Sequence, residues 1–195
     1  MRLKLFFLLL LLSTKILYSR NIISSQVCYI DSLQYYKSYK EEYPIHQCNS
    51  IISKYDSTLV LLADTTYVFK TDTLENNWLY YFIVGEVKNN IIICKQDFHK
   101  EVFYIINKMS NHKYLTVGYP QFYKEFILCI EGSYTDSPYR IQVWKYDSTK
   151  IDLYYEIKIN ELLDNFFAPS HGYVNKNCLF LKDMDSKYIC IRLKE

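Results

Sequence analysis

Short apolar segments separated by polar turns dominate the chain from Ser53 to Leu193, and many of them alternate apolar with polar residues. Alternation with a period of two is typical of strands, and closely spaced turns favour antiparallel connections. Leu59 to Leu62 and Thr66 to Lys70, for example, flank Asp64-Thr65 and predict a hairpin. The pattern therefore predicts an all-β fold of antiparallel meander or blade-like sheets, with a β-sandwich as the alternative.

The next strands are predicted on either side of a pair of asparagines. Trp78 to Val87 is a long strand, in which Gly85 indicates a bulge or a close backbone contact. Asn89-Asn90 is a two-residue turn signal, because asparagine tolerates a positive φ better than most residues. Asn90 to Gln96 is then the returning strand. Two further strands follow, Val102 to Asn107 and Lys113 to Val117.

The stretch from Gly118 to Lys158 gives the clearest strand pattern in the chain. Its strands are Phe126 to Ile130, Ile141 to Trp144 and Ile151 to Ile157, and a polar loop from Glu131 to Pro138 separates the first two. The preceding segment has a similar shape, which gives a weak internal repeat of about 40 residues, a period found in propellers and other blade arrays. We expect five side chains of this stretch to be largely buried: Phe126, Leu128, Ile130, Ile141 and Val143.

Helical patterning is confined to short stretches. Asp31-Ser32 predicts a capped helix that extends to Glu42 and ends before Pro44, although an irregular lead-in strand is the alternative. A second helical turn is predicted near residues 160–165. The chain then divides into a lead-in segment, residues 20–50, and a single β domain, residues 51–195. Near the end of that domain the pattern predicts a loop from Ala168 to Gly172 and a final hairpin, Asn177 to Lys182 with Lys187 to Leu193.

The N-terminus predicts export. Arg2 and Lys4 precede the unbroken apolar run Leu5 to Leu12, which is too short to span a bilayer and is typical of a secretory signal. We expect cleavage near Ser19, so that residues 1–19 are the signal peptide and the mature protein is periplasmic or extracellular. No later run reaches membrane length, so we expect no transmembrane segment in the mature chain.

Composition changes this picture only slightly. The chain has 21 Tyr and 11 Phe but only 4 Gly, which favours strands, although an AT-rich coding sequence would produce the same bias. Removing residues 1–19 deletes three basic residues, so the count of basic against acidic residues changes from 23 and 21 to 20 and 21. A nearly neutral chain without a basic stripe argues against nucleic acid as a partner.

The six cysteines permit 15 disulfide connectivities in an exported protein. Cys94 and Cys129 end or interrupt apolar runs and are expected to be buried. In the final hairpin the apolar face of Leu179, Leu181, Ile189 and Ile191 forces Cys178 and Cys190 together onto the opposite face. A loop of Asp183 to Asp185 would set these two cysteines directly opposite each other and permit a disulfide, whereas a loop of Met184 to Ser186 would set them on a diagonal.

Pro120-Gln121-Phe122, the strand Phe126 to Ile130 and the segment Ile141-Gln142-Val143-Trp144-Lys145 stand in the order of one propeller blade. The chain here resembles a β-propeller blade of the TolB-like or WD-repeat type over about 40 residues. It departs from that type at Tyr123-Lys124-Glu125, where neither Pro nor Gly occurs, and it has no Trp-Asp dipeptide. The resemblance implies a partial, propeller-like array, and the layout is similar to that of small exported β-rich bacterial proteins.

No stretch carries a catalytic, metal-binding or phosphate-binding motif, so we expect neither an enzyme nor a cofactor. The four histidines stand apart and are interpreted as surface-loop residues. The long loop after Ile130 holds Tyr134, Asp136 and Tyr139, which are the candidate contacts for a ligand or partner, against the alternative of an inert loop. The sequence thus predicts a binding or interaction module for a protein or a glycan. The alternatives are a structural component of the cell envelope or an immunity-type inhibitor, and then a hydrolase.

Overall fold

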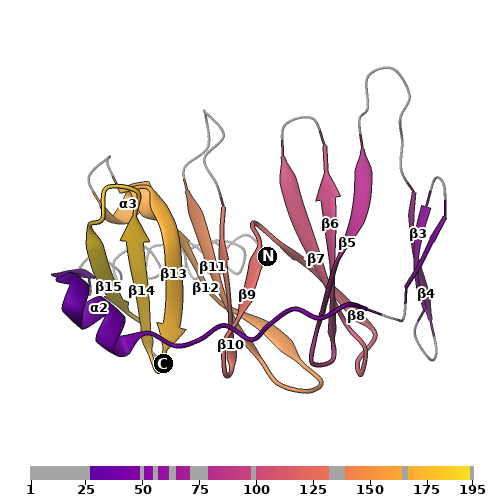
Figure 1. Ribbon diagram of the computed structural model, residues 1–195, viewed down its shortest axis with the longest axis horizontal. Coiled ribbons are helices and arrows are strands. Elements are labelled where there is room, and N and C mark those ends of the chain that lie inside the picture. Colours follow the sequence, from indigo (N-terminus) through magenta and orange to yellow (C-terminus); the bar gives the residue numbers. More distant parts are fainter. Residues whose placement is uncertain are drawn as a thin grey trace, which may run out of the picture.

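The computed structural model describes residues 27–48, 51–54, 57–61, 65–70, 79–97, 100–131, 139–163 and 167–193, with the backbone alone at 51–61. The described strands form antiparallel sheets that stand side by side in a row (Figure 1). The all-β prediction is therefore confirmed. The first sheet in chain order contains β2 (Ile51–Lys54), β3 (Ser57–Leu61) and β4 (Thr66–Lys70).

The second sheet contains β5 (Tyr80–Val87), β6 (Asn90–Gln96), β7 (Glu101–Asn107) and β8 (His112–Thr116). The third contains β9 (Pro120–Phe122), β10 (Phe126–Ile130), β11 (Arg140–Tyr146) and β12 (Ile151–Lys158). In the fourth, β13 (Pro169–Asn175), β14 (Cys178–Asp183) and β15 (Tyr188–Arg192) are joined by β1 (Val27–Ile30). The lead-in segment thus supplies the edge strand of the last sheet, since β1 pairs antiparallel with β15.

Three apolar clusters, counted among the described residues, fill the spaces between successive sheets. The central sheets are therefore buried on both faces. In β10, Phe126 and Leu128 belong to the cluster shared with the fourth sheet, and Ile127 and Cys129 belong to the cluster shared with the second. This two-sided burial explains why β10 is a continuous apolar run rather than an alternating one. Of the five side chains expected to be buried, four are, and Ile130 is partly buried against the core.

The helix α2 (Ser32–Ser38) packs on the fourth sheet at one end of the row (Figure 1). Asp31 caps it, because its carboxylate accepts the Gln34 N–H at 2.7 Å and the Gln34 side chain accepts the Asp31 N–H. Tyr35 is 1% exposed and contacts the rings of Tyr173 and Tyr188. The helix predicted from Asp31 is confirmed, but it ends at Ser38 rather than Glu42. The second helical prediction corresponds to α3 (Ile159–Leu162).

Two local predictions are wrong. The turn after β5 consists of Lys88 and Asn89 rather than Asn89 and Asn90, and Lys88 takes the positive φ of 52°. Asn90 instead begins β6, where it is buried and accepts a hydrogen bond from Asn107. The predicted loop from Ala168 to Gly172 lies largely within β13, which pairs with β14. Gly172 is needed in that strand because a Cβ there would meet Phe180 and Leu181 of the neighbouring strand.

Candidate binding site

A single extended segment, residues 39–48, runs from α2 across the row of sheets toward the first sheet (Figure 1). We call it the crossing segment. The Tyr43 N–H donates to the Phe122 carbonyl at 2.7 Å, and His46 exchanges two backbone hydrogen bonds of 2.8 Å with Glu86. Phe122 lies in β9 and Glu86 in β5, the opening strands of their sheets. The crossing segment therefore ties the third sheet to the second through the backbone.

The predicted bulge at Gly85 is confirmed, and the crossing segment explains it. Gly85 has a φ of +145°, and the register of β5 against β6 shifts beside it. A Cβ at this position would lie 2.5 Å from the His46 carbonyl oxygen and would also overlap the Ile45 side chain. Only glycine lets the crossing segment approach β5 this closely.

A pocket of about 460 Å³ opens between the crossing segment and two strand turns. The crossing segment contributes Lys40, Glu41 and Tyr43. The turn and first residue of β10 contribute Lys124, Glu125 and Phe126, and the end of β13 with its turn contributes Val174, Asn175 and Lys176. The volume is within the range of small-ligand sites. Three segments that lie far apart in the sequence thus meet at one recess.

The pocket has an apolar floor and a charged rim. Phe126 and Val174 are 3% and 2% exposed, whereas all five charged side chains are exposed. Asn175 is fixed at the floor, because its amide donates to the Ser38 carbonyl at 3.0 Å. Three lysines against two glutamates give the rim a formal charge of +1. An arrangement of this kind can hold a ligand that places an apolar group on the floor and negative charge at the rim.

Of the three loop residues predicted as contacts, Tyr134 and Asp136 lie outside the described residues. Tyr139 is partly buried and packs against the apolar cluster between the third and fourth sheets. The structure thus does not bring Tyr139 to the pocket. Sequence reasoning missed the pocket because its lysines stand alone in three separate turns and segments, with no motif to join them.

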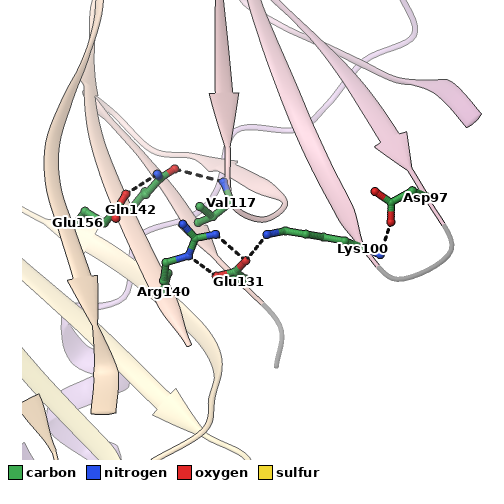
Figure 2. A network of polar contacts seen from close by, with 7 residues as sticks. All are labelled: Asp97, Lys100, Val117, Glu131, Arg140, Gln142 and Glu156. Atoms are coloured by element: carbon green, nitrogen blue, oxygen red, sulfur yellow. Dashed lines mark hydrogen bonds and ion pairs between the residues drawn. The ribbon is translucent and has the colours of Figure 1, made fainter. Parts of the chain in front are cut away.

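A second polar constellation lies between the second and third sheets (Figure 2). Glu131, which follows β10, receives hydrogen bonds from Arg140 at 2.6 and 2.9 Å and an ion pair from Lys100 at 2.9 Å. Burial would raise the pKa of Glu131, but the bonds from Arg140 and Lys100 outweigh it and lower that pKa. Gln142 extends the network, since it accepts from the Val117 N–H and donates to Glu156. The charges of Glu131, Arg140 and Lys100 are paired with one another, so this site ties two sheets together.

Of the four histidines predicted as surface-loop residues, two lie in strands: His112 begins β8, and His171 lies in β13 of the end sheet. The Nδ1 of His171 lies 2.8 Å from the Tyr35 hydroxyl, and the ring is half-buried. Burial and then the nearby Lys182 lower the pKa of His171, while burial raises that of Tyr35. At neutral pH the Tyr35 hydroxyl and His171 Nδ1 therefore share a hydrogen bond between neutral groups, which anchors α2. His99 lies outside the described residues.

In the described part of the chain, no group of three or more His, Cys, Asp or Glu side chains is arranged to hold a metal ion. No helix in the same ranges has the length and apolar character needed to cross a membrane. Comparison of the chain with protein-family models, with curated proteins and with solved structures found no match.

Proposed function

We propose that the protein is an exported binding module that holds an acidic segment of a protein partner in the pocket under the crossing segment. The observation that carries the proposal is the combination of a buried Phe126 and Val174 floor with Lys40, Lys124 and Lys176 around it. Lysines at a rim attract carboxylates and steer them during encounter.

The floor favours a peptide over a glycan. Sugar-binding sites of the stacking kind need an aromatic face open to solvent, but Phe126 is almost completely buried. The other aromatic residue of the pocket, Tyr43, is half-buried, and Lys88 Nζ lies 4.0 Å from its ring centroid. This cation already occupies one face of the ring. That face of the Tyr43 ring is therefore not open to a sugar.

The same side chains support binding rather than catalysis. The residues that line the pocket include no Ser, Cys or His, so they do not form a hydroxyl or thiol nucleophile paired with an imidazole base. The two carboxylates present, Glu41 and Glu125, are exposed to solvent. Hydrolysis of a glycoside by a pair of carboxyl groups needs one of them to be kept protonated by its surroundings. A variant in which both are changed to glutamine is therefore expected to bind the acidic ligand as well as the unmodified protein does, or better.

The binding experiment uses a labelled peptide of alternating glutamate and leucine and measures fluorescence anisotropy at low and high salt. A double variant, Lys124→Glu with Lys176→Glu, reverses two exposed charges of the rim. We expect its affinity to fall by roughly tenfold, because each rim charge contributes up to about 1 kcal/mol. Lys70→Glu, an exposed lysine of β4 outside the pocket, is the matched control and leaves the affinity unchanged.

Equal binding by the double variant and the unmodified protein would contradict the proposal. So would preferential binding of an oligosaccharide of uronic acids, which would assign the pocket to a glycan instead.

Export itself rests on the basic and apolar N-terminus and is tested separately. We expect N-terminal sequencing of the secreted protein to show that the mature chain begins between about Tyr18 and Cys28. A cytosolic protein that retains Met1 would contradict the prediction of export.

A further inference from the structure

Three of the six cysteines gather on the outer face of the fourth sheet, the face on which α2 packs. Cys28 lies in β1, Cys178 in β14 and Cys190 in β15. The parity prediction is confirmed, since Cys178 pairs with Arg192 and Phe180 pairs with Cys190. This register sets Cys178 and Cys190 on a diagonal. On its other side, Cys190 is directly opposite Cys28.

The register favours a disulfide in the direct pair over one in the diagonal pair. Directly opposed residues of antiparallel strands have Cα atoms roughly 4.5–5.5 Å apart, inside the range of about 4.4–6.8 Å that disulfides span. Diagonal neighbours are roughly 7–8 Å apart, which requires the backbone to move. Besides burial itself, both Cys178 and Cys28 lie near enough to raise the pKa of Cys190, with Cys178 the larger cause of the two, so Cys190 is the shared neighbour of two thiols.

Access to solvent also distinguishes these cysteines from those between the sheets. Cys28 is exposed, and Cys178 and Cys190 are partly exposed, whereas Cys94 and Cys129 are fully buried. Burial, and then the neighbouring Cys178, raise the pKa of Cys190 to about 12. Cys190 is therefore protonated at neutral pH and does not begin thiol exchange, while Cys28 is open to an external reagent.

We propose that Cys28 and Cys190 form a disulfide that fastens the first strand of the fold, β1, to the last, β15. The oxidant is an external disulfide, such as oxidised glutathione or the disulfide of a thiol oxidase. The Cys28 thiolate attacks one of its sulfur atoms and releases a thiolate. Cys190 then loses its proton to solvent, attacks the Cys28 sulfur in the mixed disulfide and releases the second thiolate. Two protein thiols lose two electrons and two protons, and the external disulfide becomes two thiols.

The bond acts on the binding site through the chain. β1 leads directly into α2 and then into the crossing segment, which forms one wall of the pocket. The disulfide would close a loop from residue 28 to residue 190, so it would restrict most of the chain in the unfolded state. The proposal does not depend on the nature of the ligand, and its test does not use ligand binding.

The test begins with the full chain, incubated with oxidised glutathione and then treated with an alkylating reagent at neutral pH. Trypsin releases the three cysteines in separate peptides, because Lys37, Lys176, Lys182, Lys187 and Arg192 bound them. We expect mass spectrometry to show residues 188–192 linked to the peptide that ends at Lys37, with the peptide 177–182 alkylated. A link between 177–182 and 188–192, or full alkylation of all three peptides, would overturn the proposal.

Two variants provide the control. Cys28→Ser changes an exposed side chain, so the fold should persist while the link disappears. Cys178→Ser should retain the link. Reduction is expected to lower the melting temperature of the unmodified protein and of Cys178→Ser by about 10 °C, given a loop of this length, and to leave that of Cys28→Ser unchanged. Equal melting temperatures before and after reduction, in all three proteins, would also overturn the proposal.

Discussion

Replacing Glu131 by glutamine removes the charge at the centre of the network between the second and third sheets while keeping its shape. The Glu131 side chain is only 7% exposed, against 32% for Arg140 and 42% for Lys100. The three contacts lose their negative partner, and the amide keeps only one acceptor oxygen, so each contact loses roughly 1 kcal/mol. The exposed parts of the two cations regain water and recover part of this loss. We therefore expect Glu131→Gln to lower the free energy of unfolding by about 2 kcal/mol at pH 7.

The pH dependence makes this prediction specific. Because the folded protein lowers the pKa of Glu131 below its ordinary value of 4.5, the stabilisation is complete above that value. It is lost as the pH falls through the folded pKa, since the protonated acid no longer attracts the two cations. The stability difference between the two proteins should therefore close in acid.

Urea unfolding, followed by tyrosine and tryptophan fluorescence at pH 7 and at a series of acidic values, measures this difference. Asp185→Asn is the matched control, because its ion pair with Lys187 is long, at 3.8 Å, and solvent-exposed. That variant should change the free energy of unfolding by less than about 0.5 kcal/mol. A difference for Glu131→Gln that is absent at pH 7, or that persists unchanged in acid, would refute the assigned role of the network.

Two further substitutions test the packing and the crossing segment. Leu128→Ala should cost about 3–4 kcal/mol in urea unfolding, because the side chain is fully buried between the third and fourth sheets; a cost below about 1 kcal/mol would contradict that burial. Gly85→Ala should lower the melting temperature, because of its φ of +145° and its contact with His46. Gly85→Ala should also expose the backbone amide of His46 to hydrogen exchange. If that amide stays protected in the variant, the crossing segment does not need a glycine at this position.

The sequence predicted strands best where an apolar run is bounded by polar residues close to it in the chain. The limits of β6 and β10 agree with the predicted strands because their apolar runs end at polar residues. It was misleading at β13, where Pro169 and Gly172 are typical of a loop, yet Gly172 is required by the close approach of β14. It also placed the asparagine turn one residue late, because Asn90 is needed to accept the Asn107 amide within the fold.

The pocket could not be predicted in the same way. Each of its walls is an ordinary turn or an irregular segment, and only the path of residues 39–48 brings Lys40 beside Lys124 and Lys176. That path is set by backbone bonds to Phe122 and Glu86, which lie 79 and 40 residues away from Tyr43 and His46. The alternation of apolar and polar residues and the choice of turn residues depend on near neighbours in the sequence. They therefore do not predict the path of residues 39–48 across distant sheets.

The pairing of β1 with β15 has a consequence for the order in which the fold can form. Val27 is paired with Ile191, so this edge closes only after nearly the whole chain is available. Contacts across such a separation must overcome a large loop-closure entropy before they contribute, and folds dominated by them reach the native state slowly. The three preceding sheets are built from consecutive hairpins and can form first. We infer that docking of the N-terminal strand is the last step of folding, and that the crossing segment is ordered along its full length only when that step is complete.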